Sequence, residues 1–330
     1  MGILKNFIKD LVGEKQPQQT IEYNISVTTP NNQPDKFLIT DGLPPYYIND
    51  YQSTVLFLNW CDKTKSPLLK NAKYPQWMTY KLRINPSNFH KKLIEDGYLV
   101  NAPVNVALNK LKINDLKSIL NNANIKPSGK KADLINLVIE NIDVNTLQLE
   151  TYYQPSEKAY ELLNRKENKE LIIAFENHYD ITLQEFYLVK SKCHASSTPY
   201  DILWRTLNEK QLLYSKNKSY SLLRNVHLNQ ARLLEDEEKY TDALLHYVLV
   251  AYYDLSGCDN SSCIIPKEES LIPIGIVQHI QKLSVYYTDE IIERCSRIYL
   301  PFHHYNLNQF KEIIDSIIQE TNYYMGYTQF

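Results

Sequence analysis

The chain has 330 residues, 43% of them hydrophobic and 22% charged, and its formal net charge is −2 at pH 7. This length allows two or three domains, because single hydrophobic cores rarely grow beyond about 250–300 residues. Lys and Arg number 36 against 38 Asp and Glu, which excludes a polyanion-binding surface over the whole protein, so any nucleic-acid binding must be local. Five Cys without a disulfide rhythm, no signal-peptide pattern and no apolar run of about 18 residues predict a cytoplasmic protein without membrane contact.

The N-terminal residues carry weak structural signals. Residues 1–20 are expected to form a short amphipathic helix, Met1–Val12, and a linker that contains Gln and Pro. We expect this helix to dock on the protein's own core, with a membrane surface or a partner helix as alternatives. Residues 21–29 favour a strand or an extended arm.

Capping residues indicate where the next helices begin. A helix is expected from Asn49 or Asp50 to Cys61. The run Asn85-Pro86-Ser87 is expected to begin another helix, and the extended segment 98–100 follows it.

The stretch from Leu108 to Glu140 has the most informative spacing. Its apolar residues recur every three to four positions in two runs, which predicts two helices with one buried face each. Asn114 is the expected N-cap of the first helix, which should end near Asn124, and Ser128 is the expected N-cap of the second. The residues expected to be buried are Leu108, Leu111, Ile113, Leu116, Ile119, Leu120, Ile125, Leu134, Ile135, Val138 and Ile139.

This stretch resembles the SAP domain, a DNA-binding module made of a helix, an extended link and a second helix. The resemblance rests on Leu116-Lys117, Ile125 and the run Ser128-Gly129-Lys130-Lys131-Ala132-Asp133-Leu134-Ile135. Asn124 stands where the family usually has Gly, and Leu137 stands where it often has Arg, which removes a phosphate contact. The resemblance implies that residues 108–140 bind DNA.

The residues themselves favour the same partner. Six Lys stand against three acidic residues between 108 and 140, and a helix that begins at Ser128 would offer unpaired N–H groups to a phosphate. Gly129 would let the backbone approach closely. The predicted DNA contacts are Lys112, Lys117, Lys126, Ser128, Gly129, Lys130 and Lys131. The alternatives are a solvated Lys-rich loop and a module that contacts a protein.

Two further resemblances concern the rest of the chain. Residues 93–100 and 147–163 resemble parts of a winged helix, so the SAP-like segment is expected as an insertion in a winged-helix-like frame, within an N-terminal domain at 21–165. Residues 219–253, within a helical C-terminal domain at 166–330, resemble one tetratricopeptide helix pair with a solvated turn at Glu235–Glu238. A lone helical hairpin is the alternative.

Catalytic patterns are scarce. The chain has no phosphate-cradling Gly-rich loop, no HExxH and no GxSxG, so we expect no enzyme activity, cofactor or metal. Tyr and Lys interleave at Tyr74, Tyr80 and Lys81, and again between Tyr214 and Tyr220, where they can stack bases and hold phosphates. Such mixtures are also typical of helical proteins with AT-biased codons.

The sequence therefore predicts a mainly α-helical protein of several domains, located in the cytoplasm of a bacterial host cell. Its residue usage and SAP-like segment resemble SAP-containing proteins of phages and prophages of low-GC Gram-positive bacteria. The predicted function is non-enzymatic: weak, non-specific DNA binding by the SAP-like module and binding of a protein partner by the C-terminal helices. The alternative is a scaffold protein whose SAP-like module does not bind DNA.

Overall fold

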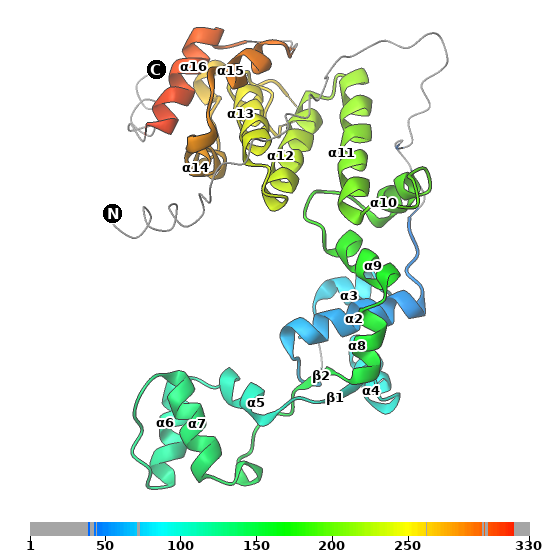
Figure 1. Ribbon diagram of the computed structural model, residues 1–330, viewed down its shortest axis with the longest axis vertical. Coiled ribbons are helices and arrows are strands. Elements are labelled where there is room, and N and C mark those ends of the chain that lie inside the picture. The colour runs from blue at the N-terminus through cyan, green and yellow to red at the C-terminus, as the bar shows by residue number, and fades with distance from the viewer. Residues whose placement is uncertain are drawn as a thin grey trace. The chain divides into compact units, whose positions relative to one another are not determined.

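The computed structural model describes residues 39, 43, 45–70, 73–261, 263–298, 300 and 303–319. The fold is mainly helical, as the sequence predicts (Figure 1). The expected amphipathic helix at 1–12, the linker and the strand at 21–29 lie outside the described residues. Within those residues, no helix has the length and apolar character needed to span a membrane.

A first group of elements, called the frame, surrounds one buried core that includes Phe57, Leu93 and Leu99. Asn49 and Asn85 each cap a helix of the frame, as predicted. The side chain of each accepts a hydrogen bond from the backbone N–H of the residue three positions later, Gln52 or Asn88. The elements of the frame are α2 (Asp50–Thr64), α3 (Gln76–Tyr80), α4 (Pro86–Glu95), β1 (Leu99–Asn101), β2 (Tyr153–Pro155), α8 (Glu157–Leu163) and α9 (Lys166–Glu176).

The two strands of the frame pair with each other, although residues 102–152 lie between them in the sequence. The pairing is antiparallel, with Leu99 opposite Pro155 and Asn101 opposite Tyr153. The strands lie side by side in Figure 1. The chain between them forms the helices α5 (Val104–Lys110), α6 (Ile113–Asn122) and α7 (Lys131–Asn141). Both ends of the intervening segment are therefore held together, as an insertion requires, while the winged-helix assignment stays a prediction.

An insertion in such a frame is expected to bury Phe89, Leu93 and Leu99 against Leu147, Tyr152 and Leu162, and two of these contacts are absent. Leu147 packs against the core of the intervening segment and not against the frame. The Tyr152 ring faces Lys110, whose Nζ lies 5.8 Å from the ring centroid, and is not part of the frame core. The other expected contact is present, because Leu162 shares one core with Leu93 and Leu99.

The C-terminal part is a succession of helices around two further buried cores. Ala231 and Ala243 are fully buried between α12 and α13, so the helical hairpin predicted at 219–253 is present, while its tetratricopeptide-like character stays a prediction. The α-helices are α10 (Leu183–Lys190), α11 (Pro199–Lys216), α12 (Tyr220–Asp236), α13 (Tyr240–Leu255), α14 (Ile274–Lys282), α15 (Asp289–Ser296) and α16 (Leu307–Ile318). Short 3₁₀ turns occur at η1 (Val144–Thr146), η2 (Lys267–Glu269) and η3 (Ser284–Tyr286).

The turn between α12 and α13 differs from the prediction at its first residue. Glu235 is mostly buried, because its carboxylate accepts a 2.8 Å hydrogen bond from the Tyr247 hydroxyl and also pairs with His279 and Lys282. These contacts join α12 to α13 and α14, so Glu235 belongs to the packing of the helices and is not a solvated turn residue.

Candidate nucleic-acid interface

The segment inserted between the strands, residues 104–149, is called the helical module. It consists of α5 (Val104–Lys110), α6 (Ile113–Asn122), an extended link, α7 (Lys131–Asn141) and the turn η1. Its buried core is separate from that of the frame and contains Leu108, Leu116, Leu120, Leu134, Ile135 and Val138. The predicted order of helix, extended link and helix is confirmed, and α5 is an additional helix that the sequence did not indicate.

Two residues predicted to be buried are exposed. Ile113, the first residue of α6, is 47% exposed, and Ile139 on α7 is 42% exposed. Ile139 lies about 100° around the helix from Val138, at the edge of the apolar stripe, so it stays in contact with water. Leu111, Ile119 and Ile125 are only partly buried against the module's core.

The helices α6 and α7 begin in the same way. At α7, the Asp133 carboxylate accepts the backbone N–H of Lys130 at 2.7 Å, and at α6 the Asp115 carboxylate accepts that of Lys112 at 3.0 Å. In both helices, the carboxylate of the third helical residue therefore accepts a hydrogen bond from the backbone N–H of the N-cap residue. The N-caps are Lys112 and Lys130, and the prediction of Asn114 and Ser128 is wrong. The shared Lys-x-x-Asp spacing is the signal that could have located them.

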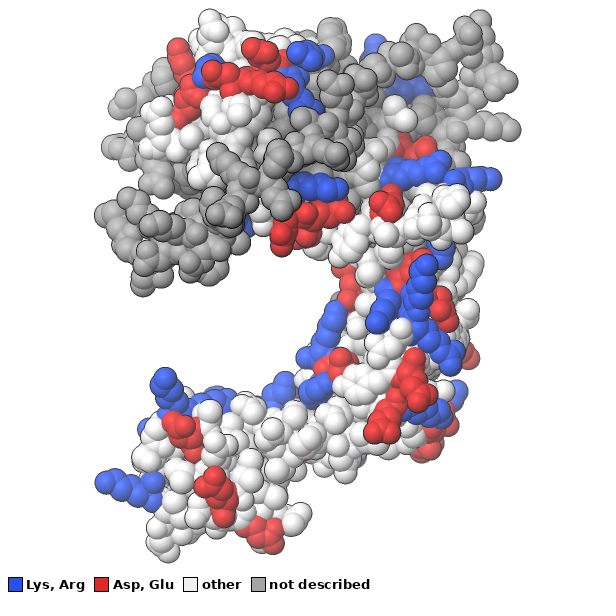
Figure 2. Space-filling model, viewed as in Figure 1, with Lys and Arg blue, Asp and Glu red and all other residues white. Residues whose placement is uncertain are grey.

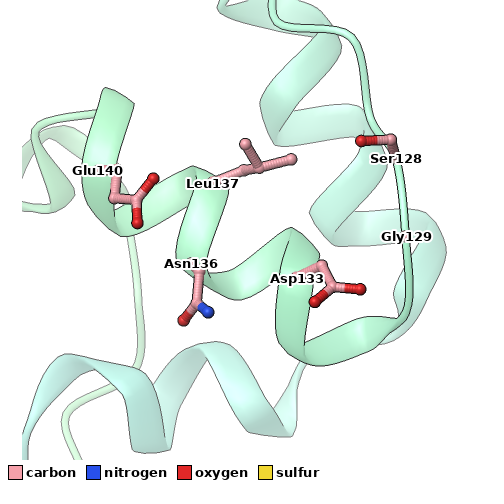
Figure 3. Close-up of a pocket in the computed structure, with 6 residues that line it drawn as sticks. All are labelled: Ser128, Gly129, Asp133, Asn136, Leu137 and Glu140. Atoms are coloured by element: carbon pink, nitrogen blue, oxygen red, sulfur yellow. The ribbon is translucent and has the colours of Figure 1, made fainter.

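Gly129 has a structural role that the sequence did not indicate. Its φ is +89°, and a Cβ at this position would lie 2.4 Å from Oδ2 of Asp133. Glycine is thus required because the backbone passes close to that carboxylate, which is turned toward the Gly129 segment in Figure 3. The close approach serves the cap of α7, and a phosphate contact at Gly129 stays a prediction.

The face of α7 next to this cap is acidic and apolar. A shallow depression of about 290 Å³ is lined by Ser128, Gly129, Asp133, Asn136, Leu137 and Glu140 (Figure 3). Two carboxylates in one depression repel a phosphate. Ser128 and Gly129 therefore lie on the side of α7 that suits an anion least.

The lysines lie elsewhere on the module. The Lys131 side chain is half-buried and donates a 2.7 Å hydrogen bond to the carbonyl oxygen of Asn109, at the end of α5. This bond places the start of α7 beside the turn that precedes α6, so Lys112 and Lys130 belong to the same end of the module. Lys110 is also engaged, because it donates to the carbonyl oxygen of Thr64 at 3.1 Å.

The remaining lysines of the module are free to meet a ligand. Lys112, Lys117, Lys126 and Lys130 are exposed, and within the described part of the chain none of them forms an ion pair. Lys117 lies more than one turn into α6 and Lys126 lies in the link, so the structure groups only Lys112, Lys130 and Lys131. Lysine and carboxylate side chains of the module both reach solvent on the face drawn in Figure 2.

The other candidate residues fall outside this group. Tyr74 is 8% exposed and its hydroxyl lies 2.8 Å from Nδ1 of His90, so it cannot stack on a base, whereas Tyr80 is 75% exposed. His303 contacts the Tyr252 hydroxyl and His304 contacts a backbone carbonyl oxygen. Across the described ranges, no three His, Cys, Asp or Glu residues are grouped so that they could hold a metal ion.

The helical module is a pair of helices joined by an extended link, with lysines at the start of both helices. Comparison with protein-family models matches residues 107–143 to the SAP domain. The match covers about a tenth of the chain and shows that the chain contains a SAP domain, which implies DNA binding by this module. Searches of the curated proteins and of the solved structures found no match.

Proposed function

We propose that this protein is a non-enzymatic DNA-binding protein whose SAP domain holds the sugar-phosphate backbone at the end where α6 and α7 begin. Lys112 and Lys130 make the principal phosphate contacts. The first backbone N–H groups of both helices add the positive ends of two helix dipoles. Lys117 and Lys126 contact the backbone further along the DNA.

The observation that carries the proposal is a set of four exposed, unpaired lysines on a module that matches a DNA-binding family. An unpaired lysine binds a phosphate without first losing an internal partner. Lys131 differs, because its ammonium group already bonds to the carbonyl oxygen of Asn109. We therefore assign Lys131 a mainly positioning role within the module.

The binding is expected to be weak and independent of base sequence. Asp115 and Asp133 place a negative charge in the first turn of each helix, which offsets part of the attraction for phosphate. Few phosphates are reached, so the Kd for duplex DNA is expected on the order of 10⁻⁴–10⁻⁶ M near physiological salt.

The test compares two double variants that each remove two positive charges. Lys112→Gln with Lys130→Gln alters the proposed site, and Lys91→Gln with Lys92→Gln alters two exposed lysines of α4 in the frame. Fluorescence anisotropy with a labelled duplex should show an affinity loss of up to about fivefold for each lysine of the first pair and little change for the second. Equal losses would refute this site.

A second role, protein binding by the C-terminal helices, is favoured by two exposed leucines. Leu212 on α11 is 57% exposed and Leu222 on α12 is 44% exposed, and the two helices pack against each other. Large contiguous apolar patches mark surfaces that a partner covers, and we propose that these two leucines belong to one such patch. A partner bound by the wild type and lost with Leu212→Glu, but retained with Leu271→Glu, would support this role.

A further inference from the structure

The frame carries two tyrosines whose rings lie largely in water. Tyr80, the last residue of α3, is 75% exposed, and Tyr47, just before α2, is 64% exposed. Aromatic rings of this size are usually at least half buried, so two such rings on one small frame invite a functional explanation.

An arginine contacts one of the two tyrosines and follows the other closely in the sequence. The guanidinium of Arg83 lies 4.6 Å from the centroid of the Tyr47 ring, and Arg83 is three residues after Tyr80, at most about 11 Å along the chain. Arg83 has a φ of +57°, a conformation that residues other than glycine rarely adopt. Because Leu82 and Ile84 on either side both pack into the frame core, this conformation directs Arg83 outward.

Two basic residues, Lys81 and Arg83, accompany these tyrosines. Lys81 lies between Tyr80 and Arg83 in the sequence, and its Nζ is 5.3 Å from the Phe175 ring. Among the described residues, neither Lys81 nor Arg83 pairs with a carboxylate. The tyrosine–arginine surface, defined as Tyr47, Tyr80, Lys81 and Arg83, therefore combines exposed aromatic rings with two uncompensated cations.

The SAP domain lacks the complementary feature. No Phe, Trp, Tyr or His occurs between residues 99 and 151, so the helical module can hold phosphates but has no ring on which a base can stack. The frame carries exposed rings that can stack on bases. The strands β1 and β2 connect the helical module to the frame.

We propose that the tyrosine–arginine surface binds unpaired DNA bases, so that the protein prefers duplexes that continue into a single strand. Exposed aromatic rings stack on bases of any sequence, and neighbouring cations hold the backbone. The two unpaired cations favour a polyanion over a protein as the occupant. The preference for a junction rests on the proposed duplex binding by the SAP domain, whereas stacking on the single strand does not.

The experiment uses the full chain and three labelled DNAs of one sequence: a blunt duplex, the same duplex with a single-stranded oligo-dT overhang, and the overhang alone. The wild type should bind the overhang duplex about five- to tenfold more tightly than the blunt duplex. Tyr80→Ala should lose this gain and leave blunt-duplex binding unchanged, while Tyr80→Phe should retain it because the ring remains. Tyr200→Ala, at a tyrosine of α11 that is 40% exposed, is the matched control and should behave as wild type.

Three results would overturn the proposal: no gain from the overhang in the wild type, the same loss from Tyr80→Ala on blunt and overhang duplexes, or the same loss from Tyr80→Phe as from Tyr80→Ala. Failure of the proposed SAP function has a different signature. In that case the blunt duplex does not bind, while binding of the overhang alone still depends on Tyr80.

Discussion

At the scale of single residues, the start of α7 combines attraction and repulsion for a phosphate. Lys130 contributes a free ammonium group, and Asp133 contributes a carboxylate that the N-cap backbone needs as an acceptor. The stability of this helix terminus and its affinity for anions therefore make opposite demands on the same position.

Replacing Asp133 with Asn separates these two demands. The amide oxygen of Asn can still accept the Lys130 N–H, but the negative charge is gone, so duplex DNA should bind about 0.3–1 kcal/mol more tightly, roughly two- to fivefold. Asp143→Asn is the matched control, because Asp143 also accepts a backbone N–H but lies beyond the other end of α7. Anisotropy titrations that find the same change at both positions, or none at Asp133, would contradict a phosphate site at the start of α7.

The sequence located the lysines of the site but not their roles. Lys112 and Lys130 are exposed, as expected, whereas Lys131 is committed to Asn109. That bond joins residues on different helices, so no local pattern could show it. Ser128 has the side-chain acceptor that is typical of an N-cap, whereas the acceptor used at this helix start, Asp133, stands three positions after the N-cap residue Lys130.

At the scale of elements, the module and the frame have separate cores, which makes a prediction about unfolding. Leu120 is fully buried in the module's core, so Leu120→Ala should cost about 2–5 kcal/mol of module stability. All three Trp of the chain, at 60, 77 and 204, lie outside the module. Far-UV circular dichroism should therefore show an earlier loss of helix, while the transition seen by Trp fluorescence stays in place.

The control for this experiment is Ile139→Ala, because Ile139 is on the same module but 42% exposed. A surface change of this kind should stay within about 0.5 kcal/mol. If Leu120→Ala shifts the Trp fluorescence transition as far as the helix signal, the module and the frame unfold as one unit. Their two cores would then not be independent in stability.

The frame core contains a histidine that should make its stability depend on pH. His90 is fully buried among aromatic rings, and burial lowers its pKa to about 4. The unfolded chain then takes up a proton at higher pH than the folded chain does, so this contribution to stability is present above about pH 6.5 and lost as the pH falls toward 4.

Replacing His90 with Phe removes that titration. The slope of unfolding free energy against pH between about 6.5 and 4 should flatten by up to about 1.4 kcal/mol per pH unit. Burial also lowers the pKa values of His227 and His246, so these two residues keep a pH dependence in the variant. Chemical denaturation at several pH values gives the unfolding free energy at each pH and therefore this slope. An unchanged slope in His90→Phe would show that His90 is not buried in its neutral form.

Two helices with a local start signal, α2 and α4, begin where the sequence predicted. They follow Asn49 and Asn85, whose side chains each accept a backbone N–H of the first turn. By contrast, α5 has seven residues and no side-chain cap. At the C-terminal end of α5, the carbonyl oxygen of Asn109 accepts a hydrogen bond from Lys131, a residue of α7. The local sequence of α5 therefore does not contain the residue that stabilises its end.

At the scale of the whole molecule, pairing of β1 with β2 holds the SAP domain on the frame. The sequence anticipated that the two ends of the insertion lie close together, because an insertion must leave and re-enter its host at neighbouring points, but it did not indicate the strand pairing that holds them. The domain boundary at residue 165 and the phage or prophage origin depend on resemblance and composition alone, and both stay predictions.

The central claim is that the SAP domain binds the DNA backbone electrostatically, and the salt dependence of duplex affinity tests it most directly. Each neutralised phosphate contributes about −0.9 to the slope of log K against log salt concentration. We predict a slope of about −2 to −4 for the wild type, reduced in magnitude by about 2 in the Lys112→Gln, Lys130→Gln variant. A slope near zero, a slope that the double variant leaves unchanged, or nanomolar binding to one sequence that survives high salt would contradict it.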